Sequence, residues 1–198
     1  MSLIRFRGET IMKNLSKLFV ILLSMAMLSA CSEVRLSLDY SPTSTEEIES
    51  RIYVNDFTYH PKQGIEQDEI RETAMGRVLL TEPVGRFVSD AVRREFRQSG
   101  ISLKSMALCY MDGEVTDFAM DSLGYSSDYM TDFRYILKKK DTHNVLYDTS
   151  YQVKFNTSKF VVAAVILNNI NKAVSDNIKQ LLVDPKFVKA AEEQCPKQ

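Results

Sequence analysis

The stretch YMTDFRYIL (residues 129–137), followed by VLYDTSYQVKF (residues 145–155), decides the fold of this chain. In each segment, apolar or aromatic residues alternate with polar ones. A period of two residues is typical of β-strands that bury one face. Two such segments of matched length, joined by residues 139–144, predict an antiparallel hairpin. Its register should be well fixed, because a slip of one residue would expose every aromatic side chain.

An amphipathic helix is expected before the hairpin. Between residues 84 and 96, apolar side chains recur at helical spacing, while arginines occupy the other face. Thr81 can cap this helix, and Pro83 suits its first turn. Gly100 stands where a left-handed residue usually follows a helix.

A longer helix is expected after the hairpin, over residues 159–182, with Thr157 or Ser158 as its cap. A short last helix should begin at Pro185, with Asp184 as its cap.

Further strands precede the hairpin in the sequence. Residues 51–59 are rich in β-branched and aromatic side chains. Residues 106–118 form a second candidate, interrupted at Asp112 and Gly113 by a bulge or turn. Residues 65–80 are ambiguous. The order β-α-β-β-β-α-α predicts a two-layer α+β fold, in which a mostly antiparallel sheet of about four strands carries two long helices on one face.

The first 30 residues have the features of a signal peptide. Lys13 and Lys17 precede an apolar run over residues 18–27, and small residues follow it. Because the run is shorter than the ~20 residues that span a bilayer, a membrane-spanning helix is disfavoured. The N-terminal position and lysine flank also argue against a buried core helix.

The sequence LSAC at residues 28–31 resembles the lipobox of bacterial lipoproteins, in which the cysteine is acylated. We therefore expect the mature protein to begin at a lipidated Cys31. Met12 is expected to be the true start, with residues 1–11 a misassigned start or an addition.

Removal of residues 1–30 from the 198 leaves 168, which suits one domain with an adequate core. Residues 31–50 should form the lipidated N-terminus and a polar tether, although residues 34–40 alternate and could instead be a short edge strand. Residues 51–198 should form a single periplasmic domain. The mature part keeps 21 of the 25 basic and 25 of the 26 acidic residues, a net charge of −4. This balance is not typical of a nucleic-acid binder.

Two cysteines remain once Cys31 is lipidated. In an oxidising compartment, Cys109 and Cys195 can form a disulfide that holds the C-terminal tail to the sheet. The alternative is that Cys109 is a small core residue and Cys195 a free thiol near the chain end.

Candidate catalytic residues are sparse. His60 precedes a proline and His143 falls in the hairpin turn, so neither has the spacing of a zinc site, and we expect no metal or cofactor. The mature chain has no GxSxG motif and no glycine-rich phosphate loop. Carboxylates that could act as an acid–base pair fall at strand ends and in a loop, where acids usually stay solvated. They are Asp112, Glu114, Asp117, Asp121, Asp128 and Asp132. We therefore do not expect an enzyme.

Several segments together resemble the YajG-like family of small bacterial lipoproteins. They are the lipobox, the helix VGRFVSDAVRREFRQSG, the strand GEVTDF, the hairpin segments DFRYIL and YQVKF, and the tail LNNINKAVSDNIKQLLVDPKFVKA. The resemblance covers nearly all of the mature chain and rests on the order of elements. The layout also looks like CsgG-type and TolB N-terminal modules and auxiliary lipoproteins of lipid transporters.

Family membership implies an outer-membrane lipoprotein that faces the periplasm of a Gram-negative cell, with no established catalytic residues. Ser32 after the cysteine, in place of Asp, resembles lipoproteins sorted to the outer membrane. We expect a non-enzymatic envelope binding or assembly module, anchored by acyl chains such as palmitate on Cys31. Its unknown protein partner should contact a β-edge or the polar helix faces. The alternative is an auxiliary lipoprotein of a lipid-transport system, which binds an acyl chain in a cleft between sheet and helices.

Overall fold

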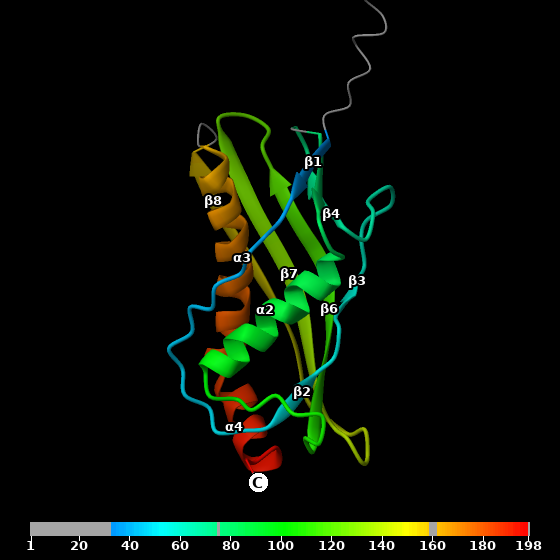
Figure 1. The fold of residues 1–198 in the computed structure, drawn as a ribbon, viewed down its shortest axis with the longest axis vertical. Helices are drawn as coiled ribbons and strands as arrows, with labels where there is room; N and C mark the ends of the chain where they lie inside the picture. The colour runs from blue at the N-terminus through cyan, green and yellow to red at the C-terminus, as the bar shows by residue number, and fades with distance from the viewer. Residues whose placement is uncertain (1–32, 75, 159–161, 198) are drawn as a thin grey trace, which may run out of the picture. The chain divides into compact units, whose positions relative to one another are not determined.

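Three long antiparallel strands form the centre of the fold in a computed structural model (Figure 1). The structure describes residues 33–74, 76–158 and 162–197. The three strands pair in chain order: β6 (Cys109–Asp121), β7 (Ser126–Lys139) and β8 (Val145–Ser158). Alternate residues of β7 are buried from Tyr129 to Tyr135, and both Ile136 and Leu137 are buried after them. The hairpin and the register predicted from the two-residue period are therefore confirmed.

The sheet is larger and more mixed than expected. Eight strands of the described residues form it, and five of them are only two to four residues long. These five are β1 (Glu33–Leu36), β2 (Ile52–Val54), β3 (Thr58–Tyr59), β4 (Glu69–Glu72) and β5 (Arg77–Leu80). The prediction of a mostly antiparallel sheet of about four strands with two long helices is wrong, because the described residues form a mixed sheet with three helices.

The short strands extend the sheet on one side. β2, β3 and β4 follow one another along the same edge of β6, each parallel to it. β4 then pairs antiparallel with β5, and β1 pairs parallel with β5 at the outer edge. The single strand expected over residues 51–59 is thus two short strands separated by residues 55–57.

β6 runs without interruption through Asp112 and Gly113, where we expected a break. The irregularity lies instead between Val115 and Asp117. Gly113 has a packing role, because a Cβ there would lie 2.2 Å from the ring of Phe57. The glycine therefore makes room for an aromatic ring and does not mark a turn.

Three helices cover one face of the sheet (Figure 1). They are α2 (Val84–Gln98), α3 (Ala163–Val183) and α4 (Pro185–Gln194). α2 packs on β6, α3 packs on β7 and β8, and α4 packs on β8. The core between the two layers includes the fully buried side chains of Phe96, Phe133 and Val174.

The C-terminal end of α2 follows its sequence signal, whereas its start does not. Gly100 has φ +83°, and the N–H groups of Gly100 and Ile101 donate to the carbonyls of Arg97 and Phe96. This is a Schellman arrangement, which only a residue tolerant of the left-handed region completes without strain. At the start, Pro83 occupies the cap position and no side chain caps the helix, so the expected cap on Thr81 is not formed.

The helix after the hairpin also differs from expectation at its start. β8 continues to Ser158 and the cap position of α3 is Val162, so Thr157 and Ser158 do not cap it. The expected helical residues 159–161 lie outside the described residues. At α4 the prediction is confirmed, since the Asp184 side chain accepts a hydrogen bond of 2.8 Å from the backbone N–H of Lys186.

The described part of the expected tether, residues 33–50, lies against the domain. Tyr40 and Ile48 are buried in its core, and the N–H of Ile48 donates to the carbonyl of Ser99 at 2.8 Å. β1 occupies the sheet edge over residues 33–36, so the alternative of an edge strand over residues 34–40 is confirmed in its first part only. Among the described residues, no helix is long and apolar enough to cross a membrane.

Candidate functional site

Cys31, the predicted lipidation site, lies outside the described residues, together with the predicted signal peptide. The first described residue is Glu33, which begins β1. Between Cys31 and this strand the sequence holds only Ser32.

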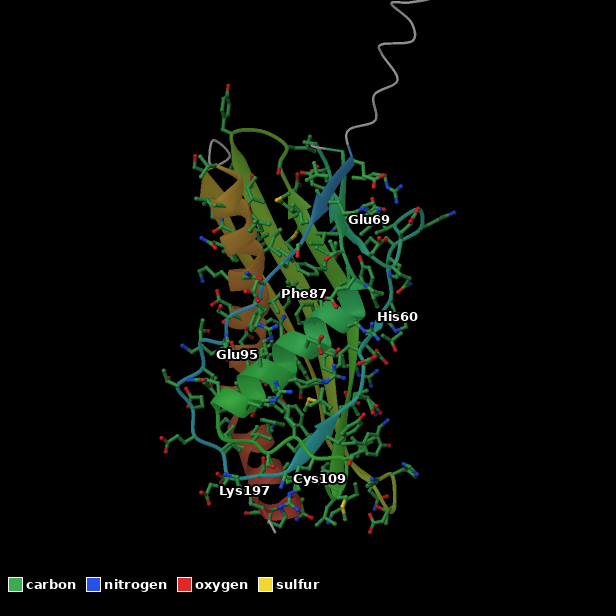
Figure 2. All side chains as sticks on the ribbon, in the orientation of Figure 1. His60, Glu69, Phe87, Glu95, Cys109 and Lys197 are labelled. Carbon is green, nitrogen blue, oxygen red and sulfur yellow. A yellow bond between two sulfur atoms is a disulfide. The ribbon has the colours of Figure 1, made fainter. Side chains whose placement is uncertain are left out.

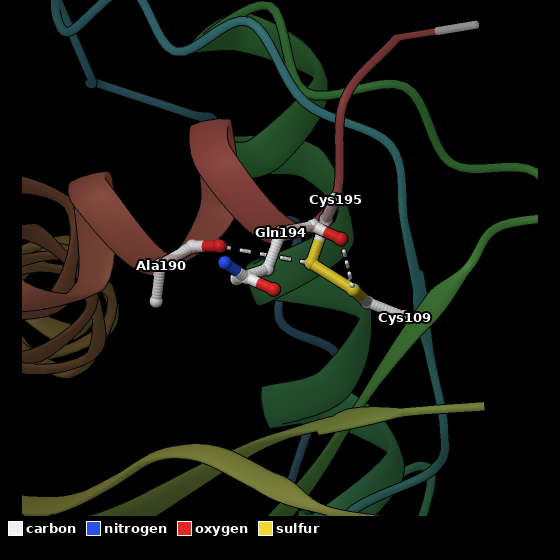
Figure 3. The surroundings of a disulfide bond; sticks show 4 residues. All are labelled: Cys109, Ala190, Gln194 and Cys195. Carbon is white, nitrogen blue, oxygen red and sulfur yellow. Dashed lines mark hydrogen bonds between the residues drawn. A yellow bond between two sulfur atoms is a disulfide. The ribbon is translucent and has the colours of Figure 1, made fainter. Parts of the chain in front are cut away.

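Cys109 and Cys195 are joined by a disulfide with an S–S distance of 2.02 Å (Figure 3). Both residues are fully buried, with Cys109 at the start of β6 and Cys195 just after α4. The bond therefore ties the last helix to the sheet, as in the first of the two alternatives left open by the sequence. The Cys109 sulfur lies 3.5 Å from the carbonyl oxygen of Gln194, and the Cys195 sulfur lies 3.9 Å from that of Ala190. These are contacts rather than hydrogen bonds, because a disulfide sulfur carries no proton.

The six candidate carboxylates fall on the sheet face opposite the helices, since they alternate with the buried residues of β6 and β7. Five of them have partners there. The contacts are Asp112–Lys138 at 2.8 Å, Glu114–Arg134 at 3.4 Å, Asp117–Arg71 at 2.8 Å, Asp121–Thr73 at 2.6 Å and Asp128–Lys154 at 3.1 Å. Asp132 lies beside Asp117 in the register. The sequence did not indicate that these acids share one face.

Hydrogen bonds favour the ionised form of several acids on this face. The Arg134 guanidinium lowers the pKa of Asp148, the Thr73 hydroxyl lowers the pKa of Asp121, and the Asn156 amide lowers the pKa of Asp128. A general acid at neutral pH needs the opposite shift. Among the described residues, every resolved shift of a carboxyl pKa is downward. The arrangement is typical of cross-strand ion pairs on a solvent-exposed face of a sheet.

The two histidines lie in different parts of the fold. The backbone N–H of His60 donates to the carbonyl of Val115, next to β3. His143, in the β7–β8 turn, has φ +57°, and its Nδ1 lies 2.9 Å from the Tyr110 hydroxyl. The described residues contain no group of three or more His, Cys, Asp or Glu side chains that could hold a metal ion.

A buried carboxylate on α2 is the polar group that the sequence analysis missed. Glu95, labelled in Figure 2, is 2% exposed. It accepts hydrogen bonds from the Tyr40 hydroxyl at 2.5 Å and from the N–H groups of Thr43 and Ser44 at 2.9 Å. The Ser175 hydroxyl of α3 lies 3.5 Å away. Burial, followed by the bond to Glu95, raises the pKa of Tyr40. Glu95 thus holds the N-terminal segment against two helices.

Three surface cavities are lined by described residues. One of about 330 Å³ lies between the N-terminal segment and α3, beside Thr43 and Ser175. A second, of about 520 Å³, lies beside Glu66 and Pro83, and a third, of about 410 Å³, lies beside Met106. Residues 114–128, which carry most of the candidate acids, line none of the three.

Comparison with known proteins shows the fold alone. Protein XCC0632 from Xanthomonas campestris, assigned to the DUF330 family, has a TM-score of 0.63 and 14% identity, over 82% of this chain and 99% of that protein. The hypothetical protein CT253 from Chlamydia trachomatis has a TM-score of 0.50 and 8% identity, over 72% and 99% of the two chains.

A protein from Caulobacter crescentus named as a lipoprotein has a TM-score of 0.43 and 7% identity, over 73% of this chain and 93% of its own. That likeness is too slight to carry an argument about this chain. No family model and no curated protein matches the sequence. Assignment to the YajG-like family in particular remains an expectation from the sequence.

Proposed function

We propose that this chain is a bacterial lipoprotein, anchored by acyl chains on Cys31 at the periplasmic side of the outer membrane. Its folded domain is a non-enzymatic binding or assembly module of the cell envelope. The observation that carries this proposal is the sequence LSAC at residues 28–31, directly after an apolar run with a lysine flank. Lipid anchoring raises the local concentration of such a module near membrane-bound partners.

Substitution of the acylated residue tests the anchor. Cys31→Ala should block lipid-dependent processing and release the protein from membranes washed with carbonate, whereas the matched variant Ser32→Ala should remain processed and bound. Mass spectrometry of the mature wild-type protein should find acyl chains on its N-terminal cysteine. If Cys31→Ala still fractionates with washed membranes, the chain is not anchored through this residue.

The partner surface that we propose is the β8 edge of the sheet. Among the described strands β8 pairs only with β7, and it is 14 residues long. A terminal strand presents backbone N–H and C=O groups that can pair with an added strand. The expected partner is therefore a protein that supplies an extended segment.

Site-specific photocrosslinking in intact cells tests the edge. A photoreactive residue at Gln152, exposed on β8, should give a discrete adduct, and one at Glu192, exposed on α4, should not. Adducts at Glu192 alone, or equal adducts at both positions, would contradict the assignment to β8.

No observation favours the lipid-transport alternative, and we do not propose it. The layer between the sheet and the helices is filled by side chains such as Tyr129, Phe133 and Tyr135, all at most 2% exposed. The three cavities described above lie at the surface, outside this layer.

A further inference from the structure

The strand register brings several chain segments to one end of the sheet. Glu33, the first residue of β1, pairs with Arg77 at the start of β5. The last residue of β4, Glu72, pairs with Met120 near the end of β6. In turn, Ser126 at the start of β7 pairs with Ser158 at the end of β8. The same end therefore holds the starts of β1, β5, β7 and α3 and the ends of β4, β6 and β8 (Figure 1). We call it the anchor end.

The connection from the anchor end to the predicted lipid is very short. Because residues 33–50 belong to the domain, only Ser32 separates Cys31 from the first strand. Two extended residues span at most about 7 Å. An acylated Cys31 would therefore hold the anchor end at the membrane surface and could not suspend the domain on a long tether.

Apolar side chains project from this same end. Leu123 and Tyr125, in the β6–β7 turn, are 64% and 90% exposed, and Val162, at the cap of α3, is 70% exposed. We call these three residues the apolar tip. Exposed leucine and tyrosine side chains on a turn are costly in water, whereas tyrosine is favoured at membrane interfaces.

The turn is held in shape by polar bonds and not by burial of its apolar side chains. Asp121 Oδ1 accepts hydrogen bonds from the Thr73 hydroxyl at 2.6 Å and from the N–H of Leu123 at 3.0 Å. The N–H of Ser122 donates to the Thr73 hydroxyl at 3.2 Å. The structure therefore presents Leu123 in an ordered turn, so little conformational entropy is lost when the tip enters another phase.

Both acids beside the tip have bonding partners, although of the two only Asp128 has a basic one. Asp121 is bonded as above, and Asp128, opposite it in the register, contacts Lys154 at 3.1 Å and Asn156 at 2.5 Å. Paired carboxylates oppose the approach to a lipid surface less than free ones do.

We propose that the apolar tip inserts into the interface of the lipid bilayer to which Cys31 is attached, so that the anchor end lies in the headgroup layer. The proposal rests on the lipidation proposed above. The tip then acts as a second membrane contact, which fixes the orientation of the domain and directs the opposite end of the sheet away from the bilayer.

Tryptophan fluorescence tests the insertion, because the chain contains no tryptophan. Full-length Tyr125→Trp, purified with its acyl chains, is reconstituted into phosphatidylcholine vesicles with or without bromine on the acyl chains. The matched control is Met106→Trp, at a residue that precedes β6 at the opposite end and is 85% exposed. We expect bromine to quench the tryptophan fluorescence of Tyr125→Trp at least about twofold more than that of Met106→Trp. Such quenching is expected of a side chain buried at the boundary of the acyl chains. Adding Leu123→Ser and Val162→Ser should reduce that quenching.

The outcomes separate the two proposals. If the protein carries acyl chains and floats with vesicles, yet Tyr125→Trp is quenched no more than Met106→Trp, insertion is wrong and the lipoprotein assignment stands. A tip that binds a protein partner instead would give this same result in protein-free vesicles. If mass spectrometry finds no acyl chain on the mature protein and the protein does not float with vesicles, the lipoprotein assignment fails. The inference about the tip then fails with it.

Discussion

At the residue scale, Glu95 is a buried side chain that bonds three groups of the N-terminal segment. Its carboxylate is buried without a basic partner in the contacts described, and it satisfies the Tyr40 hydroxyl and two backbone N–H groups. Glu95→Ala would leave these donors unpaired in the core. We expect it to lower the free energy of unfolding by about 2–4 kcal/mol, measured by urea denaturation.

Two comparisons make the Glu95 prediction specific. Glu95→Gln retains one acceptor oxygen and should cost less than Glu95→Ala, while the exposed Glu47→Ala should change stability by less than about 0.5 kcal/mol. Amide exchange of Thr43 and Ser44 should accelerate in Glu95→Ala. Similar stability of Glu95→Ala and Glu47→Ala would show that the segment is held by other contacts.

The position of Glu95 could have been recognised from the sequence. It lies three residues after Val92 and four after Ala91, on the apolar stripe of the predicted helix. An acid on such a stripe is normally buried with hydrogen-bond donors. The donors themselves could not be predicted, because Tyr40 and Thr43 lie about 50 residues earlier, in a segment whose polar composition indicated a tether.

At the element scale, the sequence predicted long elements well and short ones poorly. β7, β8 and α2 each contain enough residues for their period to be visible. β3 has two residues and β2 has three, so neither can display a period. Their place in the sheet depends on parallel pairing with β6, a contact between distant segments that the local sequence does not encode.

The disulfide is also an element-scale feature, because it fastens α4 to β6. It closes a loop with a sequence separation of 86, and the entropy of the unfolded chain falls accordingly. Replacing both cysteines, in Cys109→Ser/Cys195→Ser, should therefore lower the free energy of unfolding by roughly 2–5 kcal/mol. Denaturant unfolding of the variant and the oxidised wild type measures the difference.

A thiol count tests the bond directly. The denatured, unreduced domain without Cys31 should show no free thiol, and reduction should release two. Two free thiols before reduction would mean that the bond does not form in the purified protein.

At the scale of the whole molecule, the anchor end of the sheet brings together segments that lie far apart in the sequence. The sequence LSAC at residues 28–31, which resembles a lipobox, is visible in the chain, and so are Leu123 and Tyr125 as residues of a loop. That the first residue of β1 and the β6–β7 turn lie at one end of the sheet could not be predicted, because it depends on the register of β1, β4, β6 and β7 taken together. The candidate acids were visible in the same way, whereas their ion pairs depend on the pairing of β6 with β4 and β7 and of β7 with β8.

Acid stability is a further property of the whole molecule, since three of the five carboxyls with lowered pKa values lie in three different parts of the fold. The Arg77 guanidinium lowers the pKa of Glu69 below its ordinary 4.5, although burial opposes the shift. Arg134 does the same for Asp148. Burial raises the pKa of Asp184, but hydrogen bonds from Tyr151 and Lys186 outweigh it, and the net shift is downward.

A pKa that is lower in the folded than in the unfolded state adds stability above the unfolded pKa, and this stability is lost as pH falls through the folded value. We therefore expect the urea midpoint to decrease as the pH falls below the ordinary carboxyl pKa values of 4.5 for Glu69 and 3.8 for Asp148. Glu69→Gln/Asp148→Asn should be less stable than the wild type at pH 7 and should depend less on pH, so that the two curves converge in acid. Because both variant side chains are neutral at every pH, parallel curves would show that other groups govern the acid unfolding.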